Sequence, residues 1–197
     1  MVRKYRLGRR GEAADETRRR IVDATYALHA EQGIAATSMK QIAERADVSV
    51  GTVYHHFPTY DDAIRACGRH TLTLAPPIDP DLFVGAKTRA ERVERLVRVL
   101  FERYQRLPNY DTVRGERGKF APLGKFFAEE EARQRTLVAA ALGTSGARSP
   151  DMATVTALID YSVCRTLRAA GFTAAAAARQ IASVINAWLD ACGSGSA

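Results

Sequence analysis

The chain has 197 residues, of which 46% are hydrophobic and 26% are charged, so it is long enough for one compact domain or two small ones. Its formal net charge is +7, and this composition excludes a long disordered chain, a collagen-like repeat and a disulfide-stabilised scaffold. No segment approaches 18 uncharged apolar residues, so we predict neither a membrane span nor a secretory signal and expect a cytoplasmic protein.

The positive charge is concentrated in two segments. Residues 1–20 carry eight basic and three acidic side chains, and residues 87–125 carry eleven basic and five acidic ones. We interpret residues 1–15 as a flexible basic leader, which is either simply solvated or an arm that contacts DNA phosphates or a minor groove. The second segment is typical of the solvated faces of helices.

Turn and capping signals divide the first third of the chain into short helices. A first helix is predicted over residues 16–32, because apolar side chains recur there at helical spacing and Gly33 can end it. A second helix is predicted to begin after Ser38, since Ser38 and Gln41 form a capping box, and to end near Ala46.

A short third helix follows a tight turn. Ser49 is placed to cap a helix over residues 50–57, and Pro58 ends it. Thr59 then caps a fourth helix. Two short helices joined by a turn of about four residues are typical of a helix-turn-helix, in which the second helix enters the major groove of DNA.

The remainder of the chain is also predicted to be helical, with no strand alternation. The proline-rich segment 75–80 indicates a linker or domain boundary. The further predicted elements are a helix from Thr88 to about Pro108, a short helix or loop over 109–120, helices over 122–142, 151–170 and 173–192, and a flexible tail over 193–197. We therefore predict an all-α protein of about nine helices.

The predicted third helix carries residues suited to reading DNA. Gly51 has no side chain, so the backbone can approach a ligand closely there. Thr52, Tyr54 and the two histidines that follow supply hydrogen-bonding groups and rings. Val53 and Phe57 are spaced four residues apart, which suits an anchor to the core.

The pattern of this region resembles the tetracycline-repressor (TetR) family over about residues 16–66. The matching elements are Thr37-Ser38, Ile42-Ala43, Val48-Ser49, Gly51-Thr52-Val53-Tyr54 and Phe57, in this order. The resemblance implies a helix-turn-helix DNA-binding domain over 16–58 and a ligand-binding and dimerisation domain over 59–192. It also implies a homodimer that binds a palindromic double-stranded operator and a small-molecule ligand not identified by the sequence.

The family pattern assigns the DNA contacts to particular positions of this chain, and three residues depart from it. Asp47 stands in the turn where the family usually has Gly, but Asp tolerates left-handed geometry. Tyr60 replaces a usual Lys and can still donate one hydrogen bond, while His29 replaces a usual apolar aromatic residue and is predicted to be a half-buried core histidine. The candidate DNA-binding residues are Thr37, Ser38, Lys40, Ser49, Val50, Gly51, Thr52, Tyr54, His55, His56 and Tyr60.

The helix predicted over 122–142 has two polar residues on its apolar face. Glu130 and Gln134 either orient a ligand in a pocket, or are solvated because the helix is kinked or begins late. Aromatic residues crowd the same stretch of sequence, which suits either a cavity or an ordinary core. The candidate ligand-binding residues are Cys67, His70, Phe101, Tyr104, Tyr110, Phe127, Glu130 and Gln134, and Arg103 is a further candidate.

The last two predicted helices each carry extended apolar faces, which suggests one face for the subunit core and one for a partner. In the TetR family two such helices from each subunit form a four-helix dimer interface. The candidate interface residues are Val155, Leu158, Ile159, Ser162, Ile181, Val184, Ile185 and Trp188.

The predicted function is that of a sequence-specific transcriptional regulator, most often a repressor, whose operator binding changes when a ligand binds. The alternative is a DNA-binding protein without ligand response or with little sequence preference, and a comparison of operator with random DNA separates the two. The sequence has no nucleophile–base pair, phosphate-binding Gly loop or metal-ligand spacing. We therefore predict no enzyme activity, catalytic residue, cofactor or metal site, and the three cysteines have no metal-ligand spacing either.

Overall fold

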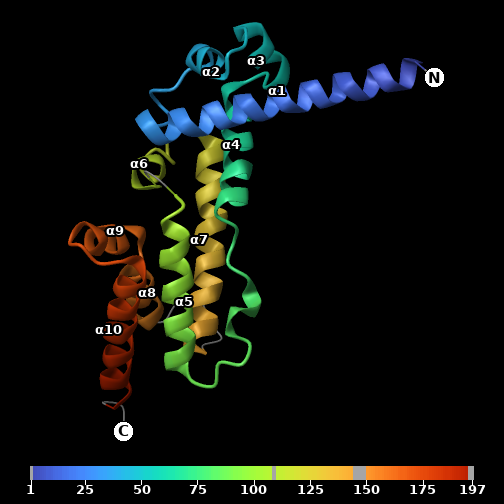
Figure 1. The fold of residues 1–197 in the computed structure, drawn as a ribbon. Helices are drawn as coiled ribbons and strands as arrows, with labels where there is room; N and C mark the ends of the chain where they lie inside the picture. The colour runs from blue at the N-terminus through green and yellow to red at the C-terminus, as the bar shows by residue number, and fades with distance from the viewer. Residues whose placement is uncertain (1, 108–109, 144–149, 195–197) are drawn as a thin grey trace. The chain divides into compact units, whose positions relative to one another are not determined.

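The computed structural model describes residues 2–107, 110–143 and 150–194 of the chain, and every regular element in these ranges is a helix (Figure 1). The all-α prediction is therefore confirmed. The chain divides into two compact units. Unit 1 comprises the residues up to Leu74 together with Thr112–Phe126, and unit 2 comprises Ala75–Asp111 and the residues from Phe127 onward.

Unit 1 begins with a long helix, α1 (Val2–Gln32). The predicted start of this helix is near Glu16, with a flexible leader before it, whereas the structure continues the helix back to Val2. Apolar spacing begins only at Ile21, so periodicity gave no sign of the earlier turns. Residues 2–15 contain no proline, and most of them are good helix formers, which is sufficient to extend a helix without an apolar face.

The two short helices of the predicted helix-turn-helix are α2 (Met39–Ala46) and α3 (Val50–His56). The predicted capping box is present at the start of α2, and Ser49 accepts a hydrogen bond from the Thr52 amide at the start of α3. Asp47 lies between them with φ +53°, in the left-handed region that the sequence analysis expected it to tolerate. The core of unit 1 is formed by apolar faces of α1, α2, α3 and α4, including Ile21, Leu28, Ile42, Val53, Phe57 and Ala63.

The fourth helix, α4 (Tyr60–Leu74), belongs to unit 1, although the predicted boundary assigned it to the second domain. It packs against α1 through small buried side chains such as Ala63 and Ala66. The segment 112–126, which includes most of α6 (Tyr110–Gly115) and the first turn of α7 (Ala121–Leu142), also belongs to unit 1. The first boundary between the units therefore follows Leu74, beside the proline-rich segment, and the other two lie on either side of residues 112–126.

Unit 2 is built around α5 (Arg89–Tyr104) and α10 (Ala174–Ser194), which pack along one another. A 3-10 helix, η1 (Pro80–Phe83), precedes α5. The core contains buried residues from α5, α7, α8, α9 and α10, among them Val97, Phe101, Val138, Val155, Ile159, Cys164, Ile185 and Leu189.

The helix predicted over 151–170 is two helices, α8 (Pro150–Leu158) and α9 (Tyr161–Ala169). Asp160 separates them and caps α9, because its carboxylate accepts a hydrogen bond from the Ser162 amide at 3.0 Å. Within the described part of the chain, no helix is long and apolar enough to span a membrane. Of the tail predicted over 193–197, residues 195–197 lie outside the described residues.

Candidate nucleic-acid interface and ligand cavity

The helix α3 is anchored by one face and exposed on the other. Val53 and the following Phe57 are 0% and 2% exposed, so they hold the helix on the core of unit 1. Val50 and Tyr54 are large apolar or aromatic residues that are nevertheless 39% and 50% exposed. Exposed aromatic side chains on a short, rigidly anchored helix are a feature of recognition surfaces.

Gly51 lies in the middle of this exposed face. A Cβ added there would meet only the Ser49 hydroxyl oxygen, at 3.7 Å, which is ordinary van der Waals contact. The fold of unit 1 therefore has no steric need for glycine at this position. The missing side chain leaves the backbone of α3 open to a close approach from outside the protein.

The structure brings most of the predicted DNA-binding residues to one exposed surface around α2 and α3, but it excludes two of them. Thr37 is 6% exposed, and its hydroxyl donates to the Gly33 carbonyl. The Tyr60 hydroxyl donates to the Ile34 carbonyl at 2.6 Å, so its single proton is not available to a phosphate. Exposed residues of the set are Ser38, Lys40, Ser49, Val50, Gly51, Tyr54 and His55, while Thr52 and His56 are half-buried.

Two arginines of α1 support this surface, and the sequence analysis had counted them only as part of the basic leader. Arg20 donates to the Asp47 carbonyl at 2.8 Å and also to the Ala46 carbonyl, so it satisfies acceptors at the end of α2. Arg18 lies over the ring of Phe57, 4.9 Å from its centroid. The Arg20 bonds hold the turn between α2 and α3, and the Arg18 contact covers Phe57 at the end of α3. No local sequence pattern identifies these contacts.

A buried histidine lies behind the same surface. The Nε2 atom of His29 is 3.0 Å from the Tyr60 hydroxyl oxygen. Because that hydroxyl donates its proton to the Ile34 carbonyl, Nε2 must carry a proton and donate to Tyr60. Burial lowers the pKa of His29 to about 4, and the Glu116 carboxylate opposes this shift more weakly. His29 is 3% exposed, which is more buried than the half-buried position expected from the sequence.

We predict that His29 makes the stability of the protein depend on pH. The folded pKa of about 4 lies below the ordinary histidine pKa of 6.5, so the unfolded chain binds the proton more readily. The stabilising contribution is complete above pH 6.5 and is lost as the pH falls toward 4, reaching a loss of about 2 kcal/mol at pH 5.

The check is urea unfolding of the wild-type chain and His29→Phe from pH 7.5 to 5. The variant removes the titrating ring while keeping an aromatic side chain, so its free energy of unfolding should fall less steeply with acidification. Equal pH dependence of the two proteins would show that His29 is protonated as easily when folded as when unfolded.

The loop between α1 and α2 is held by a carboxylate from a distant part of the chain, a contact that sequence reasoning missed. Glu116 accepts hydrogen bonds from the amides of Ile34, at 2.6 Å, and Ala35, at 3.2 Å. Ile34 is 2% exposed, so its amide has little access to water. The stretch around Glu116 is polar and interrupted by glycine, and its sequence carries no periodicity that indicates this role.

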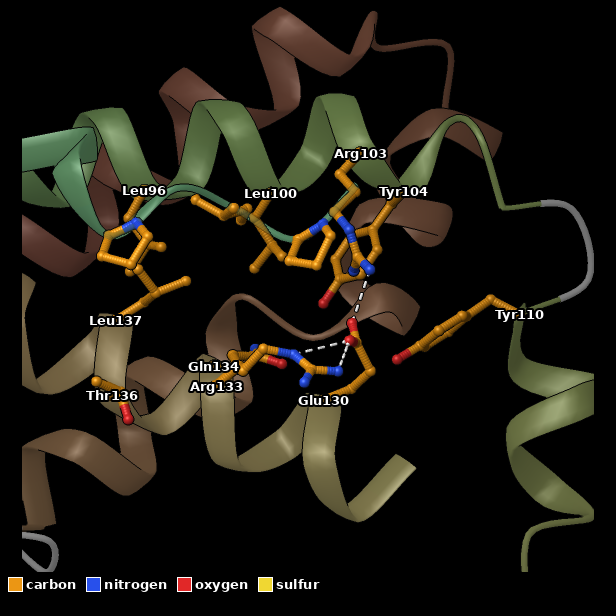
Figure 2. Close-up of a pocket in the computed structure, with 13 residues that line it drawn as sticks. Leu96, Leu100, Arg103, Tyr104, Tyr110, Glu130, Arg133, Gln134, Thr136 and Leu137 are labelled. Atoms are coloured by element: carbon orange, nitrogen blue, oxygen red, sulfur yellow. Dashed lines mark hydrogen bonds and ion pairs between the residues drawn. The ribbon is translucent and has the colours of Figure 1, made fainter. Parts of the chain in front are cut away.

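Unit 2 contains a cavity of about 270 Å³ between α5 and α7 (Figure 2). This volume lies near the lower end of the range for small-molecule pockets. Its apolar walls are formed by Pro77, Ile78, Pro80, Leu96, Leu100 and Leu137. Its polar end carries Arg103, Tyr104, Tyr110, Glu130, Arg133 and Gln134, and Thr136 also borders it.

Three charged side chains meet at the polar end of the cavity (Figure 2). One oxygen of Glu130 accepts from Arg103 at 2.7 Å, and the other accepts from the Nε and Nη2 atoms of Arg133. The side chains of Arg103 and Glu130 are 10% and 11% exposed. Nε of Arg103 also donates to the carbonyls of Ala75 and Pro76, the two residues that follow α4.

Glu130 and Gln134 on α7 both line this cavity, and their role in orienting a ligand stays a prediction. The helix is continuous from Ala121, and Glu130 is buried against two arginines at the edge of a cavity instead of being solvated. Arg133 was missed by the sequence analysis, because its position on the helix gave no sign that it faces an apolar wall.

The structure excludes four of the predicted ligand-binding residues from this cavity. Phe101 and Phe127 are 0% and 2% exposed and serve the core. Cys67 and His70 belong to α4 in unit 1, where the Cys67 carbonyl accepts from Thr71 and His70 lies 3.5 Å from an Asp23 oxygen. The remaining four, Tyr104, Tyr110, Glu130 and Gln134, do line the cavity.

Four of the predicted interface residues are used within the core of unit 2. The side chains of Val155, Ile159, Ile181 and Ile185 are buried within the single chain, so they are not available to a partner. They lie on the inner faces of their helices, which the periodic pattern could not distinguish from the outer ones. Val184 is 43% exposed, and Leu158, Ser162 and Trp188 are half-buried.

Residues 21–67 match the family described as bacterial regulatory proteins, tetR family. The HTH-type transcriptional repressor KstR of Mycobacterium tuberculosis is 38% identical over 98 residues, which cover 49% of this chain and 44% of KstR. The matched region therefore spans about half the length of the curated relatives. Residues 21–67 include α2, α3 and the first half of α4.

Solved structures extend the similarity to the whole fold. A proposed transcriptional regulator from Pseudomonas aeruginosa PAO1 superposes with a TM-score of 0.70 at 21% identity, over 92% of each chain. The fatty acid degradation regulator FadR from Bacillus halodurans has a TM-score of 0.60 at 15% identity, over 85% of this chain and 93% of that one. At this level of identity the likeness shows the fold of both units and nothing more.

Proposed function

We propose that this protein is a transcriptional regulator that binds an operator in double-stranded DNA, a proposal supported by the match of residues 21–67 to the tetR family of bacterial regulatory proteins. The observation that carries the proposal is the exposed face of α3. That face has Val50 and Tyr54 exposed and a glycine that the fold itself does not require. Such a helix fits the major groove, with side chains reaching base edges and phosphates.

The proposal includes a homodimer, a palindromic operator and release of the DNA by a small molecule bound in unit 2. Two recognition helices must lie roughly 34–36 Å apart to reach successive major grooves, so a dimer is the simplest way to present them. Val184, Trp188 and Leu158 are the predicted interface residues that remain accessible, and we assign the partner contact to them. Such a protein acts in the cytoplasm, where the operator is.

The test compares the DNA flanking the protein's own gene with a random duplex of equal length, by fluorescence anisotropy at two salt concentrations. A specific regulator binds the flanking DNA about a thousandfold more tightly than the random duplex. Equal and strongly salt-dependent binding to both would favour the second candidate, a protein that binds DNA through phosphate attraction with little sequence preference.

Two substitutions in α3 should affect this binding differently. Tyr54→Ala should weaken binding to all sequences, because the exposed hydroxyl is placed to hold a phosphate. Thr52→Ala should instead change the preference among operator sequences. The measurement is anisotropy on a panel of operator variants, and normal operator binding by Tyr54→Ala would show that the proposed position of α3 on the DNA is wrong.

Gly51→Ala should raise the stability of the protein and weaken its binding to the operator. A helical Ala in place of Gly should raise the free energy of unfolding by about 0.5–1 kcal/mol, because nothing in the protein opposes the new methyl group. The same methyl should weaken operator binding by about tenfold, or ~1.4 kcal/mol, because it stands between the helix backbone and the DNA.

Urea unfolding and anisotropy on the same preparation measure the two effects. If the variant is more stable and still binds the operator as tightly as the wild type, the proposal that α3 is the recognition helix loses its main support. A loss of both stability and binding would show that glycine is required by the fold.

A further inference from the structure

The cavity in unit 2 carries one uncompensated positive charge. Among the residues that line it, Arg103 and Arg133 are permanently charged cations and Glu130 is the single acid. Glu130 is already bound by both arginines. The remaining lining is mostly proline, aliphatic and aromatic, with Gln134 and Thr136 as neutral polar members, so no second acid in the lining offsets the excess charge.

The two arginines have different roles. Arg103 is 9% exposed and is fixed by Glu130 and by the carbonyls of Ala75 and Pro76, so it is part of the framework. Among the described residues, Glu130 alone holds Arg133, through Nε and Nη2, and the Arg133 side chain is 41% exposed. Its Nη1 group takes part in neither of these bonds and is therefore able to donate to a ligand.

We propose that this cavity binds a small organic monoanion, a carboxylate with an apolar body, whose charged group pairs with Arg133 while the body lies against Leu96, Leu100 and Leu137. This inference rests on the proposed ligand-responsive function and names the chemical class of the ligand. A single negative charge neutralises the excess, whereas a dianion would reverse it. A carboxylate can also accept a charge-assisted hydrogen bond from the Arg133 guanidinium, which a cationic group cannot do.

A cationic ligand is disfavoured by the same arrangement. It would have to compete with two guanidinium groups for Glu130, inside a site that is already positive. A neutral apolar ligand would fill the cavity but would leave the charge on Arg133 uncompensated. The ranking of anion, neutral isostere and cation is therefore the diagnostic quantity.

The experiment is isothermal titration calorimetry on the full chain with octanoate, octanamide and octylamine, and with 4-phenylbutanoate and its amide as a second shape. We expect one acid to bind per chain, at least tenfold more tightly than its amide, and the amine to bind most weakly. Equal binding of acid and amide, tighter binding of the amine, or no binding of any probe would overturn the proposal. These comparisons need no variant.

Variants that change one charge test whether Arg133 causes the preference for the acid. Arg133→Gln should weaken acid binding about tenfold or more and remove the preference of acid over amide. Glu130→Gln should strengthen acid binding, because it adds one unit of positive charge while keeping an acceptor for Arg103. Arg135→Gln, an exposed arginine on the same helix, is the matched control and should bind like the wild type. An unchanged affinity in Arg133→Gln, with folding verified by circular dichroism, would contradict the assignment.

The two proposals fail separately. DNA binding is measured without any ligand, so specific operator binding together with equal affinity for acid and amide would reject only the ligand class. Tight acid binding by a protein that does not distinguish operator from random DNA would reject only the regulatory function.

Discussion

Replacing Glu116 by alanine is expected to lower the free energy of unfolding of unit 1 by about 3 kcal/mol. The carboxylate receives hydrogen bonds from the amides of Ile34 and Ala35, and the first of these amides belongs to a residue that is 2% exposed. Hydrogen bonds to charged groups contribute more than neutral ones, and a buried amide left without an acceptor carries its full desolvation cost. Urea unfolding followed by circular dichroism measures the change.

Two controls make this result specific. Glu116→Gln keeps one acceptor oxygen, so its free energy of unfolding should fall by less than half of the loss expected for Glu116→Ala. Glu129→Ala removes an exposed glutamate from α7 and should change the free energy of unfolding by no more than about 0.5 kcal/mol. Hydrogen exchange at the amides of Ile34 and Ala35 should accelerate in Glu116→Ala. If these amides exchange at the wild-type rate, the carboxylate does not hold the loop.

Replacing Arg103 by methionine should have an effect of similar size in unit 2, a loss of about 3 kcal/mol. The side chain volume is nearly retained, so the loss comes from polar groups. The carbonyls of Ala75 and Pro76 lose their donor, and Glu130 keeps only its pairing with Arg133. Removing one partner of a buried ion pair is strongly destabilising because the other charge remains buried.

The exposed pair on the same helix provides the comparison for this variant. Arg98 pairs with Glu102 at 3.4 Å, but its side chain is 54% exposed, so Arg98→Met should change the free energy of unfolding by no more than about 0.5 kcal/mol. Adding Glu130→Leu to Arg103→Met should recover part of the loss, since it removes the buried carboxylate. Additive losses in the double variant would show that the carbonyl contacts, and not the ion pair, determine the stability.

The parts of the fold that could be predicted are those with local signals. The capping box of Ser38 and Gln41 lies within four residues, and so does the cap that Ser49 provides for α3. The tolerance of Asp47 for left-handed geometry is a property of the residue itself. These signals identify the helix-turn-helix and, through it, the exposed face of α3.

The parts that could not be predicted depend on contacts between distant residues. Glu116 and Ile34 are 82 positions apart, and a glutamate in a glycine-interrupted segment shows no local sign of such a partner. Tyr60 also gives no local sign of its partners, because its hydroxyl is hydrogen-bonded to the Ile34 carbonyl and to His29, both distant in sequence. At the end of α8 the apolar spacing continues through Ile159, so periodicity concealed the break that Asp160 introduces.

The bond from Glu116 to the loop after α1 has a consequence for how the protein is made. During synthesis the first four helices leave the ribosome before the segment 112–126 that completes unit 1. Until that segment arrives, the amides of Ile34 and Ala35 have no carboxylate partner. The nascent chain therefore completes the loop between α1 and α2 only after part of unit 2 has been translated, and a fragment that stops at Leu74 lacks the carboxylate that holds this loop.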